Sequence, residues 1–287
     1  MSNLPAFLEP LQQTLPGQPS TEPVHYVNAL FRHKRFPSLA HVLYWPSKGE
    51  SKTCMVFIPG NPGLLDFYTP FLAGIHEKAH DKMHILAHAF VGHTPGIIRG
   101  SEHPAATSLD AQIEHVIELI DTIKPVYNKI IAIGHSVGTW VVLQWAFKLP
   151  RMISYASVFT RLMPLKMLSV LFPEWPEAQL RVLRSFLDSP SAIYSSLSMA
   201  DDEMKQIQDL DGAALQQYHH RLHMYFAEKD DWVHDHKTEI LDVLQPDPGS
   251  VRYIHGPEDI PHAFCINHGE ELAEQCYRWL VEGDFVD

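Results

Sequence analysis

The chain has few of the features that mark secreted or membrane-spanning proteins. Its 287 residues include three cysteines, Cys54, Cys265 and Cys276, an odd number without the close pairs of a metal site. A reducing compartment such as the cytoplasm is the simplest interpretation. The N-terminus has no basic segment followed by an apolar one, so we expect no signal peptide. No stretch reaches the ~18 uninterrupted apolar residues of a membrane span.

An excess of basic charge is also missing. The chain has 22 Lys and Arg against 34 Asp and Glu, a formal net charge of −12. This balance argues against a nucleic-acid partner and against electrostatic docking on anionic membranes. With 45% hydrophobic residues, the chain is long enough to bury a sizeable core without disulfides or metals. We found no internal repeat and no low-complexity tract.

Strand-like and helix-like patterns alternate along the chain. Two early strands, at 24–32 and 39–45, predict an antiparallel hairpin. Further strands are expected at 53–58, 84–90, 129–133, 153–159, 222–226 and 251–255. Helices are expected at 66–80, 109–123, after residue 136, at 162–172, 177–187, 191–210, 236–244 and 266–281. The alternation predicts an α/β fold with a mostly parallel, eight-stranded sheet and helices on both faces.

One segment interrupts this alternation. Between the strands at 153–159 and 222–226 the pattern is helical only, and an insertion of this size is usually a lid or cap. We therefore expect an N-terminal arm over 1–22, a core made of 23–160 and 218–287, and a helical cap over 161–217.

The most informative motif is the pentapeptide Gly134-His-Ser-Val-Gly138. A β-branched apolar strand precedes it and a long apolar segment follows it. Strand, tight turn and helix is the setting of a nucleophile elbow, in which a strained serine exposes its Oγ above a sheet. The sequence therefore predicts Ser136 as a nucleophile, whereas we expect its neighbour His135 to have a packing role.

A serine nucleophile needs a base, usually a histidine that a carboxylate orients. After an elbow the expected chain order is Ser, then Asp or Glu, then His, in loops that follow later strands. His262 and Asp230 occupy such loops, and Asp231 is the alternative acid. For the oxyanion we expect two backbone N–H donors, from Val137 and Asn61. The side-chain amide of Asn61 is a further candidate.

Histidines outside this set could suggest a metal site. His219, His220 and His223 are close in sequence, as are His234 and His236. No H-E-x-x-H motif or cysteine pair supports them, so we expect neither a metal nor another cofactor.

Taken together, these residues resemble the α/β-hydrolase superfamily and, within it, the lipid droplet-associated hydrolase family. The resemblance rests on the loop at 58–63 with Phe67-Tyr68, the elbow, Asp230-Asp-Trp232 and Pro261-His-Ala-Phe264. It implies a serine hydrolase acting on esters, with Ser136, Asp230 and His262 as the triad, and peripheral association with lipid droplets. The apolar stretch at 162–175 is shorter than the corresponding segment of the animal members.

The cap segment favours an apolar ligand. Met163, Met167 and Phe172 are candidates to line a pocket, although such residues also pack caps onto cores. We expect hydrolysis of carboxylic esters with apolar acyl groups, of the lipid or sterol ester class. The alternative is a lipid-binding protein of lipid droplets with little or no turnover.

Overall fold

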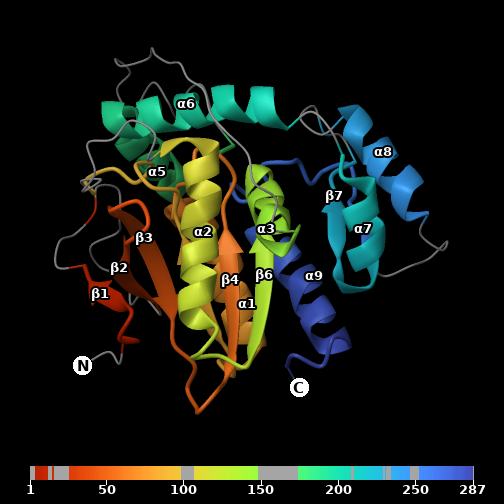
Figure 1. Cartoon of the computed structure of the whole chain (residues 1–287), viewed down its shortest axis with the longest axis horizontal. Helices are drawn as coiled ribbons and strands as arrows, with labels where there is room; N and C mark the ends of the chain where they lie inside the picture. The colour runs from red at the N-terminus through yellow and green to blue at the C-terminus, as the bar shows by residue number, and fades with distance from the viewer. Residues whose placement is uncertain are drawn as a thin grey trace.

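The computed structural model describes residues 4–11, 15, 26–97, 107–147, 174–207, 210–228, 230, 234–245 and 252–286 (Figure 1). The strands are β1 (Leu8–Pro10), β2 (Val27–His33), β3 (Ser38–Trp45), β4 (Thr53–Ile58), β5 (His84–His88), β6 (Lys129–Gly134), β7 (Met224–Phe226) and β8 (Tyr253–His255). The helices are η1 (Leu65–Tyr68), α1 (Thr69–Lys78), α2 (Leu109–Ile123), α3 (Val137–Phe147), α5 (Glu177–Leu187), α6 (Pro190–Gln206), α7 (Gly212–Tyr218), η3 (His219–Arg221), α8 (His234–Leu244) and α9 (Gly269–Glu282).

The first six strands form one sheet in the order β1-β2-β3-β5-β4-β6. β2 and β3 pair antiparallel, which confirms the predicted hairpin, and β3 also pairs antiparallel with β5. β5, β4 and β6 run parallel. In the described part of the chain, β7 and β8 form a separate parallel pair. The strand predicted at 153–159 lies outside the described residues.

Part of the segment predicted as an N-terminal arm forms a strand. Leu8–Pro10 pairs antiparallel with β2, and Leu8 is buried in an apolar cluster that Leu4 and Phe7 also contact. A run of three residues is too short to give a period-2 pattern, so the sequence alone did not indicate this edge strand.

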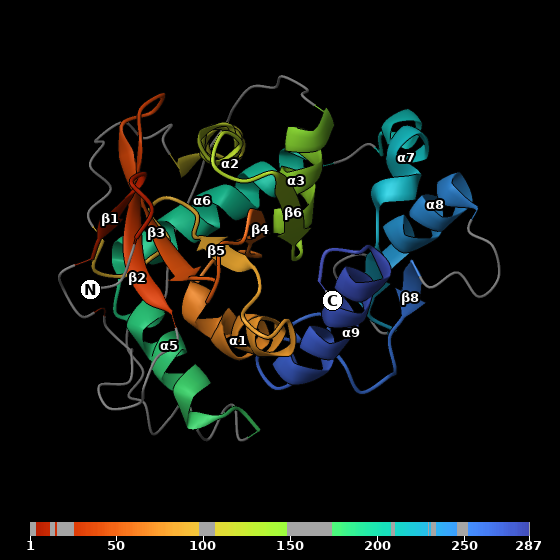
Figure 2. The same cartoon turned by 90° about the horizontal axis from the view of Figure 1, so that it is seen from below.

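The sheet separates two apolar layers. Successive side chains of a strand point to opposite faces, and β4 shows the consequence. Cys54, Val56 and Ile58 belong to the cluster packed by α2 and α3, whereas Met55 and Phe57 belong to the cluster packed by α1 and α9. Figure 2 shows α2 and α3 on one side of the sheet and α1 and α9 on the other. Both faces of β4 are therefore buried, which fixes the position of the loop that follows it.

α2 matches the helix predicted from the sequence at both ends. Ser108 caps it, because its Oγ accepts a hydrogen bond from the Ala111 N–H at 3.3 Å. Val116 and Ile120 are fully buried on its apolar face. The sequence pattern was sufficient here because a long amphipathic period and a cap residue agree.

α5, α6 and α7 lie in the segment predicted as the cap, whose boundaries stay a prediction. Figure 1 shows α6 crossing the top of the fold above α2. Asp202 of α6 is buried, and its carboxylate accepts a hydrogen bond from the Leu109 N–H at 3.0 Å, at the first turn of α2. The predicted apolar helix at 162–172 lies outside the described residues. None of the described helices combines the length and apolar character needed to cross a membrane.

Candidate active site

Ser136 lies on the tight turn between β6 and α3. Its φ is +54°, in the left-handed region that residues other than glycine rarely adopt. A Cβ on Gly134 would lie 2.5 Å from backbone atoms of Gly138, and a Cβ on Gly138 would overlap the carbonyl oxygens of Ile58 and Pro59. Only glycine fits at these two positions, because the turn packs tightly on itself and on the end of β4. Ser136 itself is exposed.

The loops after β7 and β8 bring Asp230 and His262 together. The two strands are parallel, so their carboxyl ends lie at the same edge. His262 Nδ1 donates a hydrogen bond to Asp230 Oδ2 at 2.8 Å, and the aspartate side chain is 8% exposed. Because a carboxylate only accepts, Nδ1 carries the proton and Nε2 is left as an acceptor. The alternative acid, Asp231, lies outside the described residues.

His135 joins the serine turn to the histidine loop. Its Nε2 donates a hydrogen bond to the backbone oxygen of His262 at 2.9 Å, and its Nδ1 accepts one from the Tyr68 hydroxyl at 2.8 Å. Burial and the nearby His262 ring lower the pKa of His135 to about 4, so the ring is neutral at pH 7. The packing role expected for His135 thus includes two specific hydrogen bonds.

Tyr68 extends this network to the loop after β4. Its hydroxyl accepts a hydrogen bond from the Gly60 N–H at 3.1 Å while donating to His135. Burial raises the pKa of Tyr68 well above its usual value, which keeps the hydroxyl protonated. A Cβ on Gly60 would lie 3.0 Å from the Ser136 Cβ, so this loop packs directly against the turn of Ser136. Sequence reasoning missed the connecting role of Tyr68, which no local pattern encodes.

The side chain of Asn61 is hydrogen-bonded to the cap. Its Nδ2 donates to the Ser196 backbone oxygen at 2.8 Å and to Glu203 Oε1 at 3.0 Å, both on α6. The amide is therefore engaged by α6, which leaves the backbone N–H as the group of Asn61 that can serve an oxyanion at Ser136. Burial raises the pKa of Glu203 to about 7, the Asn61 hydrogen bond opposes this rise, and adjacent Asp202 adds to it.

The remaining site predictions concern Val137, the substrate-binding residues and a metal site. Val137 is the first residue of α3, where N–H groups have no acceptor within the helix. The predicted substrate-binding residues Met163, Met167 and Phe172 lie outside the described residues. Within the described ranges, no group of three or more His, Cys, Asp or Glu side chains is placed to hold a metal ion.

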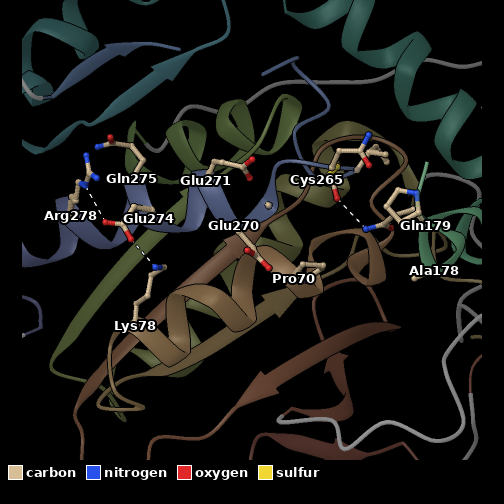
Figure 3. Close-up of a pocket in the computed structure, with 14 residues that line it drawn as sticks. Pro70, Lys78, Ala178, Gln179, Cys265, Glu270, Glu271, Glu274, Gln275 and Arg278 are labelled. Atoms are coloured by element: carbon tan, nitrogen blue, oxygen red, sulfur yellow. Dashed lines mark hydrogen bonds and ion pairs between the residues drawn. The ribbon is translucent and has the colours of Figure 1, made fainter. Parts of the chain in front are cut away.

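A cleft of about 900 Å³ lies between α1, α5 and α9 (Figure 3). Three of its charged groups are paired with one another, since Glu274 accepts hydrogen bonds from Lys78 Nζ at 2.7 Å and from Arg278 Nε at 3.2 Å. Gln179 Nε2 donates to the Cys265 backbone oxygen at 3.2 Å on the wall nearest the histidine loop. No member of the predicted Ser–His–Asp set lines this cleft, so it is separate from the candidate active site.

Comparison with known proteins gives relatives in both sequence and structure. The lipid droplet-associated hydrolase of Drosophila melanogaster is 27% identical over 292 residues, covering 81% of this chain and 92% of that protein. The thioesterase domain from the curacin biosynthetic pathway superposes with a TM-score of 0.60 at 10% identity, covering 87% of this chain and 98% of that one. A carboxylesterase of Nitrososphaera gargenis superposes with a TM-score of 0.59 at 12% identity, covering 88% of this chain and 98% of that one.

These likenesses confirm the predicted α/β-hydrolase fold, with helices on both faces of the sheet, and the eight-stranded sheet stays a prediction. The family model described as lipid-droplet associated hydrolase matches residues 51–173 and 148–265, well over half of the sequence. The chain therefore belongs to the family of lipid droplet-associated hydrolases.

Proposed function

We propose that this hydrolase cleaves carboxylic esters with apolar acyl groups, of the lipid or sterol ester class, with Ser136, His262 and Asp230 as a catalytic triad. One observation carries the proposal: His262, bonded to the buried Asp230 at 2.8 Å, lies in a loop that His135 ties to the strained turn of Ser136. The lipid class of the substrate is supported by the droplet-associated hydrolases to which the chain is related.

The reaction would proceed through an acyl-enzyme. Ser136 Oγ attacks the ester carbonyl carbon while His262 Nε2 takes the hydroxyl proton. Asp230 accepts the Nδ1–H and stabilises the imidazolium that forms. The ester C–O bond then breaks, and the alcohol leaves with the proton from Nε2. Water attacks the acyl-enzyme with the same base, which releases the carboxylic acid and restores Ser136.

Negative charge on the carbonyl oxygen would be stabilised by the backbone N–H groups of Val137 and Asn61. Val137 is at the N-terminus of α3, where the helix dipole favours negative charge. Gly60 packs against Ser136, which brings the N–H of the next residue close to the nucleophile. Preorganised donors of this kind are usually the largest contribution to such catalysis.

A fluorophosphonate probe and a panel of p-nitrophenyl esters test the proposal. Wild-type protein should be labelled at Ser136, and Ser136→Ala should lose both labelling and turnover. His262→Gln should lower kcat at least about 10³-fold, because the serine then has no base. His268→Gln, a histidine substitution six residues further along the same segment, is the matched control and should keep wild-type activity.

Two outcomes would refute the proposal. Full turnover by Ser136→Ala would remove the nucleophile assignment. Labelling of Ser136 without turnover of any ester, from acetyl to oleoyl and including sterol esters and triacylglycerol, would favour a lipid-binding protein with little catalysis.

A further inference from the structure

Hydrogen bonds attach cap helix α6 to the core, some of them beside the candidate active site. Buried Asp202 accepts the hydrogen bond from the Leu109 N–H at the start of α2. Two residues of α6, Ser196 and Glu203, accept hydrogen bonds from the one amide group of Asn61. Helix side chains lean toward the N-terminus, so Glu203 reaches back to the turn that carries the Ser196 carbonyl oxygen. The Ser196 carbonyl oxygen and the Glu203 carboxyl group therefore lie side by side on α6 and accept both amide protons of Asn61.

The hydrogen bonds between Asn61 and α6 act on the loop after β4, at the place where this loop packs beside Ser136. Gly60 is packed against Ser136 on one side, and its N–H is held by Tyr68. Asn61 follows directly, and its side chain connects this loop to α6. A backbone N–H can stabilise an oxyanion only if it is held in place before the charge develops. The hydrogen bonds that Asn61 donates to α6 fix the residue that carries this N–H.

We propose that α6 is a stationary part of the catalytic site and not a moving lid: Glu203 and the Ser196 carbonyl act as positioning groups that keep the Asn61 backbone N–H at the oxyanion position. This inference rests on the proposed ester hydrolysis at Ser136. Substrate must then enter without displacing α6, because movement of this helix would release Asn61.

The carboxyl group of Glu203 needs only an acceptor oxygen for this role. The ionised and the neutral carboxyl both offer one, and so does the carboxamide of glutamine. Glu203→Gln should therefore preserve the hydrogen bond to Asn61, whereas Glu203→Ala removes it. A role based on the negative charge of Glu203 would be lost in both variants, so the pair of substitutions separates the two explanations.

Steady-state kinetics on p-nitrophenyl butyrate test this inference. Glu203→Ala should lower kcat about tenfold with KM changed less than about twofold, less than the 10²–10³ typical of losing an oxyanion donor outright. Glu203→Gln should restore kcat to near the wild-type value. Asp201→Ala and Asp201→Asn are matched controls, because Asp201 is on the same helix and pairs with Lys205 instead. Both controls should keep wild-type kinetics.

A double-mutant cycle makes the test specific. Asn61→Ala, which also loses the hydrogen bond to Ser196, should lower kcat at least as much as Glu203→Ala, and the double variant should lose no more than Asn61→Ala alone. Wild-type kcat in Glu203→Ala or Asn61→Ala, or additive losses in the double variant, would overturn the inference. If Glu203→Ala fails to fold, the kcat of Asn61→Ala, measured with and without Glu203→Gln, tests the inference in its place. Absence of probe labelling in wild-type protein would instead refute the proposed function.

Discussion

Lowering the pH from 7.5 to 5.0 should destabilise the protein through four histidines of the β2, β3, β5 and α2 region. His33, His41, His88 and His115 are each at most 1% exposed. His33 is central, with its Nε2 3.0 Å from His88 Nε2 and its ring 4.2 Å from the His115 ring. Its Nδ1 lies 3.2 Å from the carboxylate of Glu118.

Burial lowers the pKa of all four histidines, to about 3 for His41 and His88 and to about 4 for His115. Neighbouring histidines add to the effect at His33 and His88. In the unfolded chain a histidine pKa is about 6.5. The unfolded state therefore binds more protons than the folded state below this pH, and stability is lost as the pH falls through about 6.5.

The magnitude follows from the pKa differences. At pH 5, each of these histidines lowers the free energy of unfolding by about 2 kcal/mol. Glu203 acts in the opposite direction, because its pKa is raised to about 7 and it is protonated in the folded state at pH 5. It offsets a similar loss at His135, whose pKa is lowered to about 4, so the four histidines leave a net loss of about 8 kcal/mol, against the 5–15 kcal/mol typical of a domain.

Urea unfolding followed by far-UV circular dichroism at several pH values between 5.0 and 7.5 measures this loss. Its slope with pH near pH 5 should correspond to about four protons taken up on unfolding. His115→Gln should reduce the uptake by about one proton. The exposed His220 provides the control, since His220→Gln should leave the slope unchanged. An uptake below one proton, or an equal effect of both variants, would refute the reasoning.

Three further predictions concern the hydrogen bonds and close contacts around the site. Tyr68→Phe leaves the Gly60 N–H and His135 Nδ1 without their partner; we expect a loss of about 1–3 kcal/mol in urea unfolding and a lower kcat with p-nitrophenyl butyrate. Gly138→Ala forces a methyl group onto two carbonyl oxygens at the end of β4, so thermal denaturation should show a loss above about 3 kcal/mol or no folded protein. Asp202→Ala removes the acceptor for the first N–H of α2, and calorimetry should show a loss of about 1–2 kcal/mol.

The sequence alone was informative about the site where the determinants are local. Ser136 was predicted from its two glycines, the apolar strand before it and the helix after it. The choice between Asp230 and its neighbour Asp231 depends on side-chain direction, which a sequence pattern does not specify. The hydrogen bond from His262 to Asp230 depends on two loops that are 32 residues apart. The contacts of Asn61 with α6 span 135 and 142 residues, so no local signal could have indicated them.

By itself, the sequence determined the alternation of strands and helices, the limits of the helix at Leu109–Ile123 and the turn that carries Ser136. Each depends on periodicity, capping or turn chemistry within a few residues. Only the tertiary structure decided that β5 lies between β3 and β4, that Leu8–Pro10 adds an edge strand, and that Glu203 accepts a hydrogen bond from Asn61 in the loop beside Ser136. These features depend on which surfaces are buried together, and that is a property of segments distant in the chain.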